Sequence, residues 1–130
     1  MKAKASLTFA FLPLVLASCT QERPSERPAV APAATVTGSP QRCIPLASMQ
    51  ESKIRDDWTI DFMAGGKRVY RNTLPNRCPG LRAANAFSYE TSLTQLCDTD
   101  IIYVLNTVGG SLQRGAGCGL GEFVPVELEQ

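Results

Sequence analysis

The sequence predicts a mostly β domain, a small antiparallel barrel or roll of five to six short strands that two disulfides hold together. Three observations lead to this fold class. Short apolar segments recur along residues 43–130, turn residues separate them at intervals of about ten residues, and helical periodicity is nearly absent. Four cysteines lie in the same segment, enough for two disulfides.

The clearest element is a β-hairpin over residues 58–74. Apolar and polar residues alternate over residues 58–63, and residues 69–74 return as the second strand. Between them, Gly65 and Gly66 accept the positive φ angles that a tight turn requires. This segment therefore predicts two adjacent antiparallel strands.

The register of this hairpin stays open at the level of sequence. The alternation places Trp58, Ile60 and Phe62 on one buried face. A two-residue turn would set Phe62 opposite Val69. The same turn would set Ile60 opposite Arg71, whose charge would then have to reach water at an edge. A bulge at the glycines would instead shift the register by one residue.

Weaker signals complete the domain. We expect one strand within residues 44–55, with Asp56 and Asp57 as the turn that leads into the hairpin. Further strands are predicted over residues 87–91, 101–106 and 120–126, the last with Pro125 at an edge position. Residues 92–97 are too short to assign, and residues 107–117 are predicted to form a loose glycine-rich loop.

The N-terminus has the pattern of a secretion signal. Lys2 and Lys4 form a short positive region, and residues 5–16 are mostly apolar. This apolar run is too short for a permanent membrane-spanning helix. Residues 1–18 are therefore predicted to be a signal peptide that is removed on export.

Residues 16–19, Leu-Ala-Ser-Cys, resemble the lipobox of bacterial lipoproteins. The resemblance implies that Cys19 becomes the first residue of the mature chain, with a diacylglycerol on its sulfur and a further acyl chain on its amine. Several acyl chains give stable anchoring where one does not. Thr20 stands where inner-membrane lipoproteins of many Gram-negative bacteria often carry Asp, which favours the outer membrane, facing the periplasm. A cleaved leader without lipid is the alternative.

Residues 19–42 are predicted to be a tether. This stretch is rich in proline and alanine and contains no aromatic residue, so it cannot build a core. Extended proline-rich chain rises about 3.1 Å per residue, which lets the tether hold a domain up to roughly 70 Å from the lipid surface. The folded domain is then expected over residues 43–130.

The four cysteines of the domain are Cys43, Cys78, Cys97 and Cys118. An even number suits an oxidising compartment, and the absence of a Cys-x-x-Cys pair counts against a metal site and a thioredoxin-type redox site. Their spacing is compatible with all three possible pairings. We favour Cys43–Cys118 with Cys78–Cys97, because a closed sheet would bring the first and last segments of the domain side by side.

Composition excludes several classes of function. The chain has no histidine, so it contains no Ser-His-Asp triad, Cys-His pair or His-bearing zinc site. From Cys19 onward it carries 11 basic and 12 acidic groups, which leaves no basic excess for binding nucleic acid. Neither a cofactor nor a metal is expected.

Short motifs follow one another along the domain: Cys43-Ile44, Asp57-Trp58-Thr59-Ile60, Asn72-Thr73-Leu74-Pro75, Cys78-Pro79-Gly80-Leu81, Phe87-Ser88-Tyr89, Gln95-Leu96-Cys97, Asp100-Ile101-Ile102, residues 118–123 and Pro125-Val126. In this order they resemble the bacterial domain-of-unknown-function family 6491, whose members are small exported proteins, often with lipoprotein leaders. All four cysteines of the domain fall on the family's cysteine positions. The resemblance implies export and disulfides, and it carries over no catalytic or binding residue.

A local basic bias marks the middle of the domain. Arg68, Arg71, Arg77 and Arg82 form a candidate binding face for a carboxylate, a phosphate or a lipid head group. The alternative is a solvated surface whose charge is balanced by acidic residues such as Asp61.

Two acidic pairs and a glycine-rich run are weaker candidates. Asp98 and Asp100 could serve a hard cation, although a capping and turn-forming role is favoured. Asp56 and Asp57 could act as an acid and a base, but adjacent residues in a turn seldom converge on one substrate. Residues 115–121 lack the Lys-Ser/Thr ending of a phosphate-binding loop.

Together these patterns predict a non-enzymatic, lipid-anchored module that binds a partner in the cell envelope or acts as an accessory to a larger assembly. The membrane is engaged through the lipid, and no nucleic acid is expected as a partner. The alternative is a small envelope enzyme that acts on cell-wall or lipid material through carboxylates and arginines.

Overall fold

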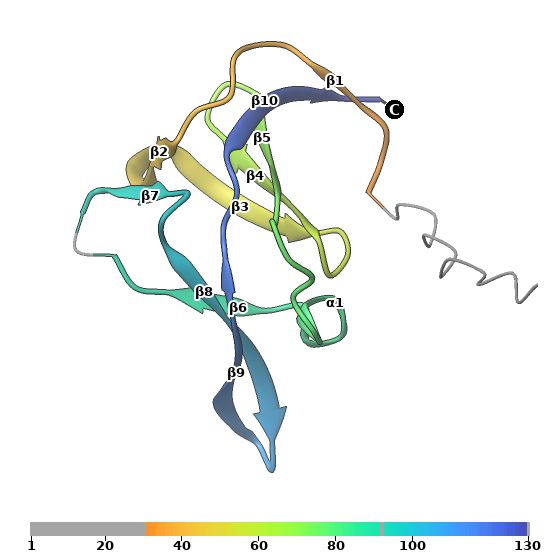
Figure 1. Ribbon diagram of the computed structural model, residues 1–130, viewed down its shortest axis with the longest axis vertical. Helices are drawn as coiled ribbons and strands as arrows, with labels where there is room; N and C mark the ends of the chain where they lie inside the picture. Colours follow the sequence, from red (N-terminus) through yellow and green to blue (C-terminus); the bar gives the residue numbers. More distant parts are fainter. Residues whose placement is uncertain (1–30, 92, 130) are drawn as a thin grey trace, which may run out of the picture.

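The computed structural model describes residues 31–91 and 93–129, which form a mostly β domain (Figure 1). Within these residues there are ten strands and two short helical turns, so the expected five to six strands are too few. The strands are β1 Ala34–Val36, β2 Cys43–Pro45, β3 Met49–Ile54, β4 Thr59–Ala64, β5 Arg68–Thr73, β6 Phe87–Tyr89, β7 Gln95–Cys97, β8 Ile101–Val108, β9 Ser111–Gly119 and β10 Phe123–Leu128. The helical turns are a 3-10 turn at Leu46–Ser48 and α1 at Leu81–Ala84. No helix of the described part is long and apolar enough to cross a membrane.

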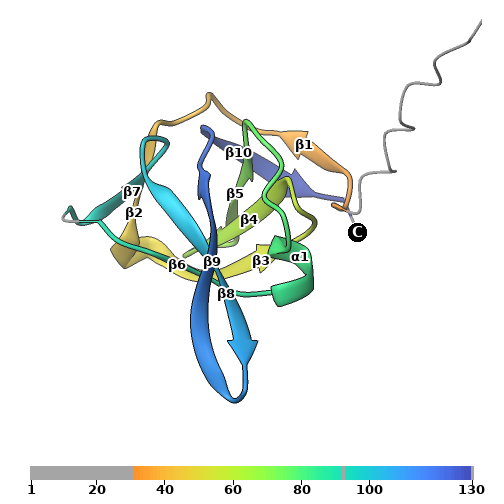
Figure 2. The same cartoon turned by 60° about the horizontal axis from the view of Figure 1, so that its bottom comes forward.

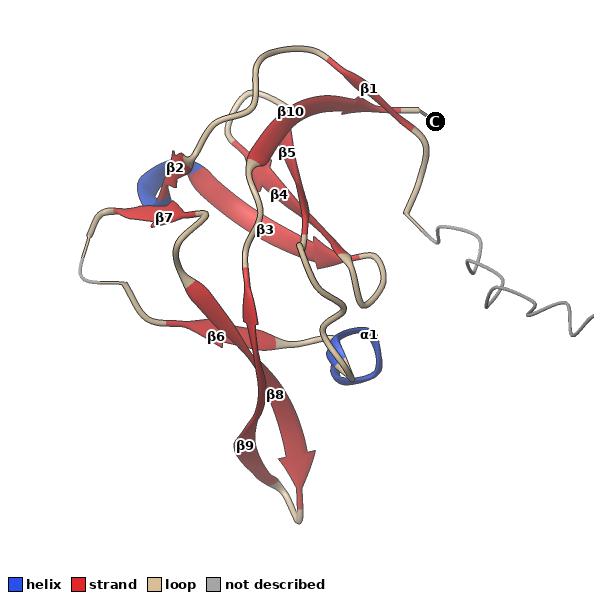
Figure 3. Ribbon diagram, in the orientation of Figure 1, coloured by secondary structure: helices blue, strands red, loops and turns tan. Residues whose placement is uncertain are grey.

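The strands form three antiparallel sheets (Figure 3). The largest has the order β1-β10-β5-β4-β3, a second joins β6, β8 and β9, and β2 pairs with β7 alone. The predicted antiparallel, mostly β class is confirmed. The pairings of the described strands do not close into a ring, so the barrel or roll stays a prediction.

The core is centred on Phe62 of β4, which is fully buried. Its ring packs edge-on against Phe123, at 5.4 Å between centroids, and against Phe87, at 6.3 Å. The three phenylalanines come from β4, β10 and β6, so they join the five-stranded sheet to the three-stranded sheet. Burial of such a side chain contributes roughly 1.5–3 kcal/mol. Trp58, expected on the same buried face, is 45% exposed because it lies in the turn before β4.

The predicted hairpin is confirmed as β4 and β5, with the shifted register. Phe62 lies opposite Tyr70 and Asp61 lies opposite Arg71. The loop has three residues instead of two, since Lys67 adopts a left-handed φ of 64° after Gly66. Because side chains alternate along a strand, the extra residue removes Arg71 from the core face and places it beside Asp61.

The ten residues before Cys43 belong to the folded domain. Residues 33–42, hereafter the strap, run along β10: β1 pairs with it, the Thr37 amide donates to the Pro125 carbonyl at 2.9 Å, and Gln41 and Phe123 exchange two hydrogen bonds of 2.8 Å. The predicted boundary at residue 42 is therefore wrong. Pro125 is likewise not on an edge strand, because the strap covers the far side of β10.

The disulfides join Cys43 to Cys97 and Cys78 to Cys118, so the predicted pairs Cys43–Cys118 and Cys78–Cys97 are wrong. Cys43 and Cys97 lie opposite each other on β2 and β7, with Cα atoms 4.0 Å apart. Cys78, which precedes α1, meets Cys118 of β9. The strap, and not the segment at Cys43, pairs with the last strand, β10. The reason for joining Cys43 to Cys118 therefore no longer holds.

Residues 107–117, expected to be a loose loop, form most of a hairpin of β8 and β9 that projects from the body of the domain (Figure 2). Gly109 and Gly110 make its turn, both with positive φ. Two glycines of β9 lie close to side chains of the facing strand: a Cβ at Gly115 would come within 2.5 Å of the Asn106 amide nitrogen, and one at Gly117 within 3.1 Å of the Tyr103 ring. Close approach across the strands accounts for these two glycines.

Candidate functional site

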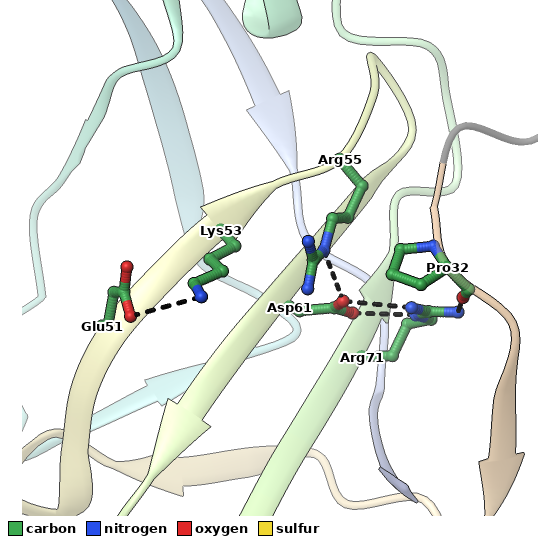
Figure 4. Close-up of polar contacts among 6 residues, drawn as sticks. All are labelled: Pro32, Glu51, Lys53, Arg55, Asp61 and Arg71. Atoms are coloured by element: carbon green, nitrogen blue, oxygen red, sulfur yellow. Dashed lines mark hydrogen bonds and ion pairs between the residues drawn. The ribbon is translucent and has the colours of Figure 1, made fainter. Parts of the chain in front are cut away.

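A buried ionic cluster lies on the five-stranded sheet, on the face of β4 opposite to the core (Figure 4). At its centre Asp61 is fully buried and accepts three hydrogen bonds. Arg55 Nε donates to Oδ2 at 2.8 Å. Arg71 donates twice, from Nε to Oδ1 at 2.8 Å and from Nη2 to Oδ2 at 3.0 Å. We call Arg55, Asp61 and Arg71 the Asp61 cluster.

The sequence of β4 explains why an aspartate is buried here. Ile60 and Phe62 point into the core, so the alternation sends the side chain between them to the other face. Register then determines its neighbours, because Asp61 lies opposite Lys53 of β3 on one side and Arg71 of β5 on the other. A buried carboxylate is costly unless it is paired and hydrogen-bonded, and two guanidinium groups meet that requirement.

Arg71 also ties the start of the described chain to the sheet. Its Nη1 donates to the carbonyl oxygen of Pro32 at 2.8 Å, so one guanidinium holds both Asp61 and the residue that precedes the strap. Hydrogen bonds to Asp61 raise the pKa of Arg71 above its ordinary value, against the opposing effect of partial burial. Arg71 therefore remains charged throughout the range in which proteins are stable.

The Asp61 cluster carries an excess of positive charge. Two guanidinium groups face one carboxylate, and Arg55 uses only its Nε within the described residues, which leaves its terminal nitrogens as open donors. Lys53 rises from the same side of β3 (Figure 4) and lies 3.8 Å from Glu51, a loose surface pair. Arg55 and Lys53 together present donors suited to a carboxylate or a phosphate.

The predicted arginine face does not exist as one surface. Arg71 belongs to the Asp61 cluster, whereas Arg68 is three residues earlier on the same strand and therefore on its other face, with Nε donating to the Gly65 carbonyl. Arg77 pairs with Asp57 at 2.7 Å. Arg82 lies on α1. The expectation that these four residues share a face is wrong, because strand alternation and the chain reversal after β5 separate them.

The acidic pairs have structural roles. Asp56 accepts a hydrogen bond from the Trp58 amide, and Asp57 accepts one from the Arg82 amide. Asp100 accepts one from the Cys97 amide at 2.7 Å, in agreement with the favoured turn-forming role, whereas Asp98 forms an ion pair with Arg42 at 3.0 Å. In the part of the chain that the structure describes, no group of three or more His, Cys, Asp or Glu side chains is placed to hold a metal.

Sequence patterns do not predict the Asp61 cluster, because they indicate only a surface counter-charge at Asp61. One signal is present in the sequence: Asp61 stands between Ile60 and Phe62 and is followed by the apolar residues Met63 and Ala64, and a charged side chain that is covered there needs a partner. The identity of that partner depends on the hairpin register, which the sequence left open.

Comparison with known proteins adds no relative, since the chain matches no family model, no curated protein and no solved structure. The resemblance to family 6491 therefore stays a prediction. The predicted leader at residues 1–18, the lipidated Cys19 and the tether up to residue 30 lie outside the described residues. The two disulfides are compatible with an exported protein.

Proposed function

We propose that this protein is an exported, lipid-anchored module without catalytic activity, which binds an acidic group of a partner protein in the cell envelope through Arg55 and Lys53. The observation that carries this proposal is the open end of Arg55. Its Nε is held by the buried Asp61, while its terminal nitrogens have no partner among the described residues. The predicted leader at residues 1–18 and the lipobox cysteine Cys19 that follows it support the anchor, and the outer membrane facing the periplasm is the proposed location.

The geometry of Arg55 favours recognition. Binding normally costs about 0.5–1.5 kcal/mol for each flexible side chain that must be ordered. Arg55 is already oriented by Asp61, which Arg71 holds in turn with two hydrogen bonds. Only part of the usual entropy cost therefore remains when a carboxylate meets the planar donors of this arginine.

The same geometry argues against Asp61 as a general base. All of its hydrogen bonds come from two positively charged groups, and its side chain has no contact with solvent. Both of its oxygens are already occupied by guanidinium donors, so a substrate proton cannot reach them. Asp61 is better suited to position Arg55 than to react with a substrate.

Crosslinking in cells tests the proposed function. The full chain, tagged at its C-terminus, is crosslinked in intact bacteria, and co-purifying proteins are quantified by mass spectrometry. We expect one reproducible partner whose recovery falls about tenfold in Lys53→Gln and about tenfold in Arg55→Lys. The Arg55→Lys variant keeps a positive charge beside Asp61 but loses the planar donors of the guanidinium group. Arg114→Gln is the control, since Arg114 lies on β9 of the projecting hairpin, where it pairs with Glu90.

Two results would contradict the proposal. One is a partner whose recovery is the same in wild type, Lys53→Gln and Arg55→Lys. The other is the absence of any protein above background, in which case the alternative of a small envelope enzyme has to be tested with cell-wall and lipid substrates.

A further inference from the structure

The hairpin of β8 and β9 extends beyond the body of the domain (Figure 2). β6 pairs with β8 only as far as Val104, so the end of the hairpin has no neighbouring strand among the described residues. We call residues 106–113 the tip, and every one of them is exposed. The tip therefore adds nothing to the core, and its composition is free to serve a surface contact.

The tip carries apolar side chains on both of its faces. Val108 is 54% exposed and Leu112 is 69% exposed. Val108 lies opposite Ser111 and Thr107 lies opposite Leu112, and successive pairs of an antiparallel hairpin point to alternate faces. Val108 and Leu112 therefore project from opposite faces. A protein docked on one face would cover one of these side chains, whereas a medium that surrounds the tip covers both.

The tip also lacks charge. Between Asp100 and Glu122 the sequence contains one charged residue, Arg114, which lies outside the tip. Its guanidinium group pairs with Glu90 and lies 4.7 Å from the centre of the Tyr103 ring. Transfer of a charged side chain into lipid is costly, and entry of the tip does not require it. Exposed apolar side chains without charges between them suit the interface of a lipid bilayer.

We propose that the tip inserts into the interface of the bilayer in which the chain is anchored, with Val108 and Leu112 below the lipid head groups. This inference rests on the lipid anchor of the proposed function and uses neither Arg55 nor Lys53. Two apolar side chains alone bind a membrane weakly, and the anchor supplies the high local concentration that such a contact needs.

The reach of the chain and the structure of the hairpin limit this contact. Residues 20–30 span at most about 40 Å when fully extended, and a domain of about a hundred residues has a diameter of roughly 35 Å. The tip can therefore reach the bilayer that holds Cys19. The outer edges of the tip carry backbone groups without a neighbouring strand in the described part of the chain, and these groups need water or lipid polar groups as partners. Insertion should thus be shallow.

Vesicles that hold the protein at a defined point test this proposal. The full chain is expressed with a C-terminal hexahistidine tag, purified as the cell processes it, and attached to phosphatidylcholine vesicles through a nickel-chelating lipid. The Glu129 amide donates to the Ala33 carbonyl at 2.9 Å, so the tag leaves the domain beside the segment that leads to Cys19. Flotation without nickel lipid reports the anchor separately, because the chain has no histidine of its own.

Tryptophan fluorescence then reports the tip. The Leu112→Trp variant is compared with the wild type, whose only tryptophan is Trp58 in the turn before β4. We expect the added emission to lie at shorter wavelength and to be quenched by lipids brominated near the head group. The matched control is Leu93→Trp, since Leu93 is an equally exposed leucine in the loop between β6 and β7. Its added emission should not be quenched. Ser111→Trp is a second reporter on the tip.

A second substitution measures the contribution of the opposite face. Val108→Ser, added to Leu112→Trp, should lower the ratio of inserted to free tips about fivefold, because one apolar side chain no longer leaves water. Val36→Ser is its control, since Val36 is an exposed valine on the strap. The anionic lipid phosphatidylglycerol should not change the quenching, because the tip has no charge.

Three results would each overturn the proposal. The first is emission at position 112 that stays unquenched on vesicles, or that is quenched no more than emission at position 93. The second is equal quenching with and without Val108→Ser. The third is a shift to shorter wavelength that appears without vesicles and grows with protein concentration, which would show that a second copy of the chain covers the tip.

Discussion

Arg71 and Asp61, on adjacent strands, form a bidentate ion pair in which the carboxylate is fully buried. The pair lies on the face of the sheet that faces away from the core, where alternation alone would predict solvent. It joins three parts of the chain, since Arg71 also holds Pro32 and Asp61 also holds Arg55. Stability and the proposed binding site therefore share the same groups.

Replacement of Asp61 by asparagine should destabilise the domain strongly. The substitution removes the only carboxylate that meets both Arg55 and Arg71 within the described residues, and loss of one partner from a buried ionic group costs about 3–5 kcal/mol. Urea unfolding followed by circular dichroism measures the free energy of unfolding. Glu90→Gln, at an exposed pair, is the control and should have no measurable effect. If the free energy of unfolding falls by less than about 1 kcal/mol in Asp61→Asn, water would have to solvate the two arginines in place of the carboxylate.

The contribution of Arg71 should not vary with pH in the neutral and mildly alkaline range. A group whose pKa is raised on folding adds stability at every pH below its unfolded pKa, and the contribution is lost only as the pH rises through the folded value. For Arg71 the unfolded pKa already lies far above pH 10, and the hydrogen bonds to Asp61 raise the folded pKa further. The difference in unfolding free energy between wild type and Arg71→Gln should therefore be equal at about pH 7 and about pH 10. A clear fall by pH 10 would show that another titrating group supplies the stability assigned to Arg71.

Peptide mapping without reduction should recover fragments that link Cys43 to Cys97 and Cys78 to Cys118. On the chain-entropy account, loops of 54 and 40 residues contribute about 4 kcal/mol each. Paired replacement of either disulfide by serines should lower the free energy of unfolding by about 2–5 kcal/mol. Recovery of a fragment that links Cys43 to Cys118 would contradict these pairs and support the alternative pairs Cys43–Cys118 and Cys78–Cys97.

Removal of the strap should destabilise the domain although all four paired cysteines remain. A chain that begins at residue 43 lacks β1 and the two hydrogen bonds between Gln41 and Phe123, and it exposes the edge of β10. At about 0.5–1.5 kcal/mol for each hydrogen bond, we expect several kcal/mol less stability than in a chain that begins at residue 31. Thermal unfolding of the two chains measures the difference. Equal midpoints would place the true domain boundary near residue 42.

Local patterns predicted much of the fold. The alternation over residues 58–63 and the adjacent glycines were enough to find the hairpin of β4 and β5, because both signals depend on neighbouring residues. The glycines of β9 led to the wrong expectation of a loose loop, because neighbouring residues alone do not show what a glycine faces. A glycine that makes room for Asn106 of the facing strand has the same local signature as one in a loop.

The candidate site was less accessible than the fold. Of the four predicted arginines, Arg71 alone belongs to the Asp61 cluster, and its partner was not identified in advance. Arg55 gave no signal, because it follows β3 and meets Asp61 only after β3 and β4 have paired. Pairing of distant residues is a property of strand register, which a single sequence specifies weakly.

The sequence by itself determined the β class, the four cysteines of the domain, the absence of histidine chemistry and the expectation of export. Each of these depends on composition or on residues that are close along the chain. Only the tertiary structure decided which cysteines pair, that the strap belongs to the domain, and that Asp61 is buried between two arginines. These features arise where strands distant in sequence meet. Local preferences allow several arrangements there, and one is selected because a buried charge needs a partner and an open strand edge needs to be covered.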